Sequence, residues 1–143
     1  MGVRTYSTRV EVDAEMAKVW EVMSDVARWP QWTASVSEVQ RLDTGEFAVG
    51  SRARVRQPRL RPATWTVESL EPGAAFSWWT ASPGARIVGD HRIVPGQGDA
   101  GVAVVLTATM SGPMAGLAHL LYGRLTQRYL EIEAAGLKKA CET

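Results

Sequence analysis

The residue best suited to acid/base chemistry in this sequence is His91, in the middle of the segment from Arg86 to Val94. An imidazole is the one side chain whose ordinary pKa allows proton transfer near neutral pH. In an extended strand His91 would face the same side as Ile87 and Ile93, toward an apolar interior. The sequence suggests no partner for it, so two interpretations stay open. His91 is either an acid/base group or a structural residue that donates a hydrogen bond to a backbone carbonyl.

Other arrangements that carry chemistry are missing from the sequence. No histidine, cysteine or carboxylate cluster has the spacing of a metal site. The Gly-x-Ser-x-Gly pattern of a serine nucleophile and the glycine-rich phosphate loops do not occur. We therefore expect neither a metal nor a cofactor. The second histidine, His119, is expected to be solvated.

Two of the six tryptophans are candidates to bind a flat molecule. Trp65 and Trp78 lie on neighbouring strand-like segments, and the alternation of apolar residues directs both toward the same interior. Gly89 has the same parity as His91 and would leave open space beside the two rings. The alternative is that both indoles are core packing. Trp29 and Trp32 are expected to plug the mouth of the interior, and Trp79 to face outward.

Arginines are concentrated in one part of the sequence. Arg52, Arg54 and Arg56 alternate along one strand-like segment, and Arg59 and Arg61 follow it. The pattern predicts a solvated outer face, with Ala53, Val55 and Gln57 pointing inward; binding of an anionic partner is the alternative. Arg128 falls within an apolar helical stripe, where we expect an ion pair with an acidic strand residue. The alternative is that it reaches toward the cavity or its mouth, where it could meet a ligand carboxylate.

Composition limits the remaining possibilities. The chain has 143 residues, 45% of them hydrophobic, which suits one globular domain over residues 1–143. The formal net charge of +1 offers no reason to expect a nucleic acid as partner. No stretch is apolar enough for stable membrane insertion, and the single cysteine, Cys141, suits a reducing compartment. We expect a cytoplasmic protein, either a monomer or a homodimer.

The elements that must position His91 and the tryptophans follow from periodicity and turn residues. Alternating patterns predict seven strands, each bounded by turn residues such as Gly, Pro and Asp: 3–12, 36–42, 51–57, 63–70, 75–81, 86–94 and 102–110. Apolar residues at helical spacing predict two short helices between residues 13 and 32, after the first strand.

A long helix is predicted at the C-terminal end, from Pro113 to Ala140. Proline suits the first position of a helix because it needs no hydrogen bond for its nitrogen. At about 100° per residue one stripe of this helix is apolar: Met114, Leu117, Ala118, Leu121, Leu125, Tyr129, Ile132 and Ala135. This stripe is expected to pack along the sheet.

Several local motifs in this order resemble a known family. They are Val10–Ala14 with Val19-Trp20, Met23–Val26, Trp29–Trp32, Trp65–Val67, Glu71–Gly73, His91–Pro95 and Gly112 before the last helix. The chain resembles the START-like or SRPBCC superfamily, and within it the polyketide cyclase/dehydrase-type branch. The resemblance implies an α+β helix-grip fold of the START and Bet v 1 type. In it a curved antiparallel sheet of about seven strands wraps around the long C-terminal helix and encloses a cavity.

The resemblance also implies a site and two functions. The cavity of such a fold opens near the start of the long helix, which adds helix residues to those selected by strand parity. The predicted ligand-binding set is Trp65, Trp78, His91, Met110, Leu117, Leu121 and Tyr122. The first function is binding of a small hydrophobic or aromatic molecule, lipid-like or polyketide-like. The alternative is a polyketide aromatase/cyclase in which His91 is the acid/base. A third possibility, an interaction protein, would use Trp79 and the arginines.

Overall fold

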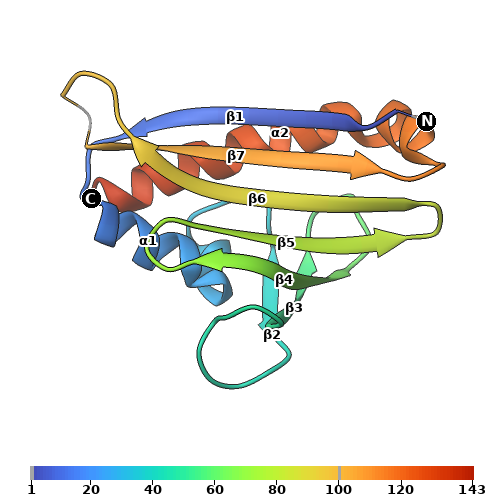
Figure 1. Ribbon diagram of the computed structural model, residues 1–143, viewed down its shortest axis with the longest axis horizontal. Helices are drawn as coiled ribbons and strands as arrows, with labels where there is room; N and C mark the ends of the chain where they lie inside the picture. The colour runs from blue at the N-terminus through green and yellow to red at the C-terminus, as the bar shows by residue number, and fades with distance from the viewer. Residues whose placement is uncertain (1, 100) are drawn as a thin grey trace.

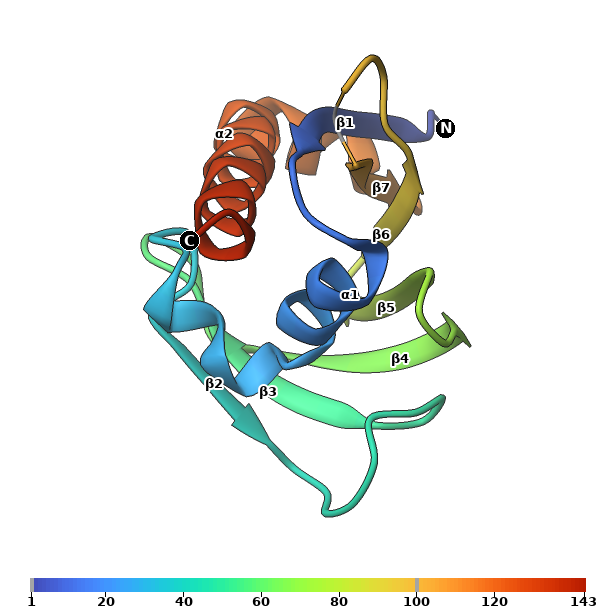
Figure 2. The same ribbon diagram turned by 90° about the vertical axis from the view of Figure 1, so that its left-hand side faces the viewer.

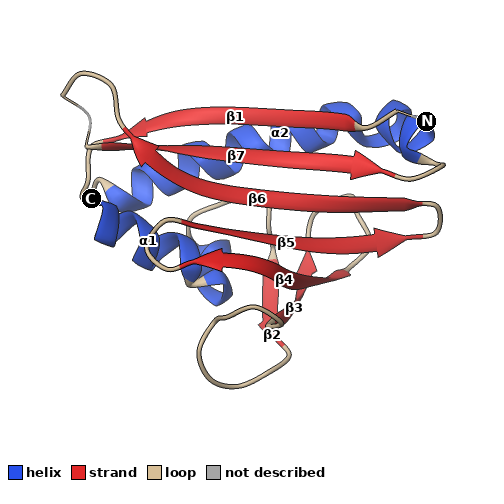
Figure 3. Cartoon of the chain, in the orientation of Figure 1, coloured by secondary structure: helices blue, strands red, loops and turns tan. Residues whose placement is uncertain are grey.

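The chain forms one antiparallel sheet and three helical segments, which a computed structural model describes for residues 2–99 and 101–143 (Figure 1). The strands are β1 (Arg4–Val12), β2 (Glu38–Arg41), β3 (Arg52–Arg56), β4 (Ala63–Glu71), β5 (Ala75–Ser82), β6 (Ala85–Pro95) and β7 (Val102–Ser111). The helices are α1 (Met16–Ser24), the 3-10 helix η1 (Val26–Gln31) and α2 (Ala115–Cys141). The predicted order of elements is confirmed, and Figure 3 shows how strand dominates the chain before α2.

The sheet is continuous, with the order β1-β7-β6-β5-β4-β3-β2. It curves into an arc, and α1 and α2 both lie on its concave side (Figure 2). Short hairpins join strands β3 to β7 in sequence, while β1 joins the far edge by pairing with β7 from Arg4 opposite Met110 to Val12 opposite Val102. The predicted helix-grip arrangement is therefore present.

Strand parity is also confirmed, because alternate side chains are buried. In β3 the arginines Arg52, Arg54 and Arg56 are exposed, whereas Ala53 and Val55 between them are buried. In β7 the side chains of Val104, Leu106, Ala108 and Met110 are buried and those between them are half-buried, whereas β5 buries residues 75–78 without alternation. A period of two residues is what an extended chain imposes when one face of the sheet is packed.

The main core fills one end of the concave side. Its largest fully buried side chains come from all layers of the fold: Phe76, Met23, Leu106, Leu137, Val12, Val19, Val26, Val67 and Val104. A separate small cluster of Tyr6, Ala108, Met110 and Ala115 lies at the other end, where α2 begins. Between these two clusters the concave side is less filled.

The face that α2 turns toward the sheet differs from the predicted stripe. The buried residues are Ala115, Gly123, Glu133, Ala134, Leu137 and Cys141. Leu117 and Leu121 are 46% and 62% exposed, and Ala135 is exposed as well. Small residues permit the closest approach of a helix to its neighbours, and Ala115, Gly123 and Ala134 take this part of the inner face beside Leu137. At Gly136 an added Cβ would overlap the carbonyl oxygen of Trp32.

Helix α2 begins at Ala115, and Pro113 lies in the turn before it rather than at the first helical position. The amides at the start of a helix have no partner within it and must bond elsewhere. The amide of Met114 donates to the carbonyl of Gly84 in the β5–β6 hairpin, at 2.8 Å. The N-terminal end of the helix is thereby tied to that hairpin, and the helix starts two residues after Pro113.

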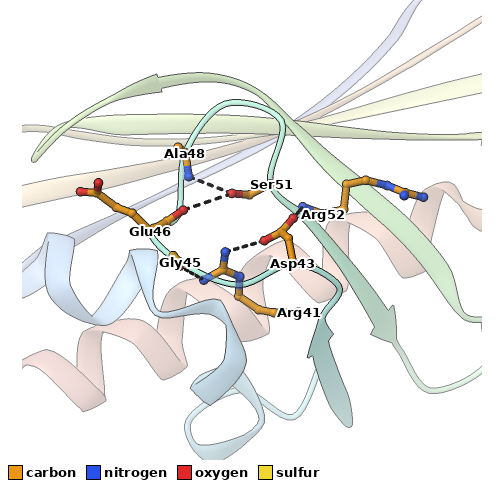
Figure 4. A network of polar contacts seen from close by, with 7 residues as sticks. All are labelled: Arg41, Asp43, Gly45, Glu46, Ala48, Ser51 and Arg52. Atoms are coloured by element: carbon orange, nitrogen blue, oxygen red, sulfur yellow. Dashed lines mark hydrogen bonds and ion pairs between the residues drawn. The ribbon is translucent and has the colours of Figure 1, made fainter.

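The connection between β2 and β3 is held by a network of polar contacts (Figure 4). Asp43 accepts hydrogen bonds from the side chain of Arg41, at 2.6 Å, and from the backbone amide of Arg52, at 2.7 Å. The hydroxyl of Ser51 accepts from the amide of Ala48, at 2.9 Å. These contacts fold the loop back on itself.

The side chain that this loop contributes to the interior is Phe47. Its ring packs edge-on against Phe76, with centroids 5.1 Å apart and planes at 90°. The β2–β3 loop therefore packs against the aromatic side chains of β5.

Candidate functional site

A cavity of about 1190 Å³ lies between the sheet and α2. Its inner walls come from β4, β5, β6 and β7 on one side and from α2 on the other, through residues such as Ala118, Leu130 and Glu133. Exposed residues of the β3–β4 connection and of the β5–β6 hairpin complete the lining, among them Arg59, Arg61 and Pro83. The mouth of the cavity therefore lies where these two connections face α2.

His91 faces this cavity and is not alone. Its Nε2 atom lies 3.3 Å from Oε2 of Glu133 on α2, and both residues line the cavity. Both are buried, at 5% and 8% exposed. A carboxylate this close to one ring nitrogen holds the imidazole in one orientation and can exchange a proton with it.

The imidazole of His91 packs against aromatic rings. The ring of Phe76, its cross-strand neighbour, stacks on it at 4.3 Å between centroids and 7° between planes. Trp29 approaches from η1 at 5.3 Å. The Nδ1 atom of His91 is buried and has no hydrogen-bond partner within residues 2–99 and 101–143. A buried nitrogen of this kind normally pairs with a water or another polar group, whereas here the surrounding side chains cover it.

Trp65 and Trp78 form one wall of the cavity. Their ring centroids are 5.7 Å apart, and both lie over Gly89, whose Cα has no side chain to hold them off. A Cβ at Gly89 would contact both indoles at ordinary van der Waals distances. The open space predicted at Gly89 is therefore occupied by the two rings, and the glycine lets them lie close to β6.

The predicted helix residues divide into two groups. Tyr122 lines the cavity, as does Met110 of β7. Leu121 instead lines a second, outer groove of about 420 Å³, and Leu117 lines neither hollow. The expectation that these leucines line the cavity fails because α2 turns Ala115, Gly123 and Glu133 inward.

Sequence reasoning missed two residues at the site. Glu133 was not selected because a charged residue is expected on the outer face of a helix. Its signal was its spacing of one turn from Leu130 and from Leu137, both of which point inward. Trp29 was expected to plug the mouth, but it is 2% exposed and lines the cavity beside His91.

The sequence predicts the surroundings of four further side chains, and the prediction of an ion pair for Arg128 is wrong. Arg128 is exposed and makes no ion pair with the described residues; it lines the outer groove. His119 is exposed, as expected, but its Nδ1 also lies 2.5 Å from the hydroxyl of Tyr6. Trp79 is half-buried, because the guanidinium of Arg86 covers its ring at 4.8 Å. Gln57 faces inward as predicted, donating to the carbonyl of Ser35 at 3.2 Å.

Within the described part of the chain, no group of three or more histidine, cysteine or acidic residues is placed to hold a metal ion. Among the described helices, none combines the length and the apolar character needed to cross a bilayer.

The family model described as "Polyketide cyclase / dehydrase and lipid transport" matches residues 4–142. The chain belongs to the polyketide cyclase/dehydrase and lipid transport family. This confirms the resemblance drawn from the sequence motifs. No curated protein matches the chain significantly.

Solved structures share the fold of this polyketide cyclase/dehydrase family member. The Zhui aromatase/cyclase from Streptomyces sp. R1128 has a TM-score of 0.79 and 19% identity, over 99% of this chain and 94% of that one. A norcoclaurine synthase point mutant from Thalictrum flavum has a TM-score of 0.71 and 13% identity, over 98% and 94%. Ara h 8.0201 has a TM-score of 0.66 and 9% identity, over 95% and 98%. At these identities the likeness establishes the fold.

Proposed function

We propose that the protein binds a small, largely apolar molecule with aromatic or polyketide character in its cavity and moves protons on it through His91 and Glu133. The observation that carries the proposal is the buried His91–Glu133 pair on the wall of a cavity that is also lined by the indoles of Trp29, Trp65 and Trp78. Indole faces favour flat apolar ligands, and a site with convergent titratable groups supports chemistry on what it binds.

The family description and the aromatase/cyclase named among the structural neighbours support a cyclase or dehydrase reaction. In such a reaction the imidazole of His91 removes a proton from a carbon next to a carbonyl. The resulting enolate either attacks a second carbonyl of the same chain or expels a β-hydroxyl. In the first case the alkoxide takes up the proton, and in the second the proton leaves with the hydroxyl as water. No other reactant is needed.

Glu133 has two tasks in this scheme. Its carboxylate fixes the orientation of the imidazole and stabilises the imidazolium that forms when His91 takes up a proton. The Nδ1 atom of His91 has no partner among the described residues and is covered by its surroundings, so a ligand oxygen or a water would bond to it only after a local rearrangement. We also propose that the protein is located in the cytoplasm, because a reducing compartment suits its single cysteine, Cys141.

The test separates binding from proton transfer. The probe is 4-phenylbutan-2-one, an aryl ketone whose exchange of α-hydrogen for deuterium can be followed by NMR in heavy water. The protein should accelerate this exchange, and His91→Ala and Glu133→Gln should each slow it by about 10²-fold or more. Binding, followed by tryptophan fluorescence, should change little in both variants.

Thr126→Val provides the control, because Thr126 lines the same cavity without titrating. It should keep the exchange rate. If the ketone binds but its exchange stays at the solvent rate in every protein, the acid/base role is wrong. The function is then binding alone, the alternative that the apolar cavity and the lipid transport members of the family favour.

A further inference from the structure

The mouth of the cavity carries positive charge that nothing in the fold neutralises. Arg59 and Arg61 line the cavity, and Arg59, Arg124 and Arg128 line the outer groove. None of these four makes an ion pair with the described residues. Elsewhere some arginines are paired: Arg9 with Glu11, Arg41 with Asp43, Arg86 with Glu68 and Arg92 with Glu71. Arg52, Arg54 and Arg56 of β3 are exposed and, like these four, make no ion pair with the described residues. What sets the four apart is that they lie together around the two hollows.

The two hollows meet at the same residues. Arg59 and Tyr122 line both the cavity and the outer groove, so the guanidinium of Arg59 stands at their junction. The outer groove has no acidic residue in its lining, whereas it has three arginines. The cavity's acidic lining residues are Asp90 and Glu133; Glu133 is the partner of His91, and Asp90 lies on β6, away from the β3–β4 connection.

The backbone at Arg59 holds a conformation that an arginine disfavours. Its φ is +70°, the single positive value among the described residues other than glycine. Residues Gln57 to Leu60 form a β-turn closed by a hydrogen bond of 3.1 Å from the amide of Leu60 to the carbonyl of Gln57. Pro58 takes the first central position and Arg59 the second, where a turn of this kind strongly favours glycine.

The turn is fixed in place from the opposite wall. The hydroxyl of Tyr129 on α2 donates to the carbonyl of Pro58. This hydrogen bond connects the turn to the helix on the opposite side of the mouth. A strained residue in an anchored turn at the edge of a cavity is a candidate for function, because the fold must stabilise it at a cost. Glycine would relieve the strain but would present no charge.

We propose that Arg59, together with Arg61, Arg124 and Arg128, binds an anionic group of the ligand at the mouth of the cavity. The ligand is then an amphipathic anion: its flat apolar part lies between the indoles, and its carboxylate, sulfate or phosphate stays at the arginines. This inference rests on the proposed ligand cavity and adds the chemical class of the molecule that enters it.

The test uses two fluorescent probes that differ by one charge. Anilinonaphthalene sulfonate carries an anionic group, and N-phenylnaphthylamine has the same rings without it. The intact protein should bind the sulfonate more tightly, and added salt should weaken the sulfonate alone, because salt screens the arginines.

Arg59→Gly is the decisive variant, since glycine suits the backbone and removes the guanidinium. Its affinity for the sulfonate should fall about fivefold, in line with an exposed charge pair, while its affinity for N-phenylnaphthylamine should hold. Its thermal stability should be equal or higher. Arg54→Gln is the matched control, because Arg54 is exposed on the outer face of β3 and lines neither hollow. It should leave both affinities unchanged.

Ala118→Trp fills the cavity from α2 and should abolish binding of both probes. If both probes bind the intact protein equally and Arg59→Gly changes neither, the anionic site is wrong and the cavity proposal stands. If neither probe binds, the cavity proposal is wrong and this inference falls with it.

Discussion

Gly136 offers a direct test of how closely α2 approaches the segment that follows η1. A Cβ at this position would lie 3.1 Å from the carbonyl carbon of Trp32 and closer still to its oxygen. The obstacle is backbone on both sides, so no side chain can rotate away. We expect Gly136→Ala to push the C-terminal half of α2 away from Trp32.

The magnitude follows from two opposed effects. Overpacking of this kind costs up to about 3 kcal/mol, and the better helix propensity of alanine returns about 1 kcal/mol. The net loss of stability is about 2 kcal/mol, or roughly 4–8 °C in the midpoint of thermal unfolding for a chain of this size. Gly116→Ala is the control, because a Cβ there meets nothing within 4 Å. It should stabilise the protein by a few tenths of a kcal/mol, about the propensity gain near a helix end.

Circular dichroism during heating measures both variants. Glu133 lies one turn before Gly136, so the same displacement should also reduce proton transfer by His91. If Gly136→Ala unfolds at the temperature of the unmodified protein or above it, the close packing described for α2 is wrong.

Two more predictions concern titrating groups. Burial raises the pKa of the Cys141 thiol to about 11, so at pH 8 the folded protein should resist iodoacetamide, while the protein unfolded in guanidinium should react; rapid labelling of the folded form would contradict this. Hydrogen bonds lower the pKa of three carboxyls: that of Glu11 chiefly through the side chain of Arg9, that of Asp43 through the amide of Arg52, and that of Glu142 through the amide of Asp13. Their stabilising contribution is complete above the ordinary carboxyl pKa of about 4 and is lost as the pH falls through the lowered values. Stability measured by urea unfolding should therefore drop below about pH 4, and Asp43→Asn should flatten that drop while Glu21→Gln on α1 leaves it unchanged.

The sheet was predictable from the sequence because one of its faces is packed. A period of two residues sorted Trp65, Trp78 and His91 onto the inner face, where they lie. Glycine and proline marked the hairpins, since the left-handed backbone at positions such as Gly73 and Gly84 excludes most other residues.

The orientation of α2 was not predictable in the same way. A hydrophobic stripe identifies the inner face only if that face is packed against a core, and here much of it faces a cavity or meets backbone. Glu133 and Gly136 therefore lie inward, and Leu117 and Leu121 lie outward. Glu133, the partner of His91, could not be predicted for the same reason. A contact between Glu133 and His91 depends on how a helix sits over a sheet, which no local pattern records.

The pairing of the first strand with the last has a consequence for how the protein folds. Among the described residues β1 pairs with β7 alone, with Arg4 opposite Met110, and α2 packs on both strands. Contacts this distant in sequence form slowly, because the entropy cost of closing the intervening loop comes before the contacts stabilise it. During synthesis, β1 must wait for nearly the whole chain to leave the ribosome. His91 and Glu133 can meet only after that, so the site is one of the last parts of the molecule to form.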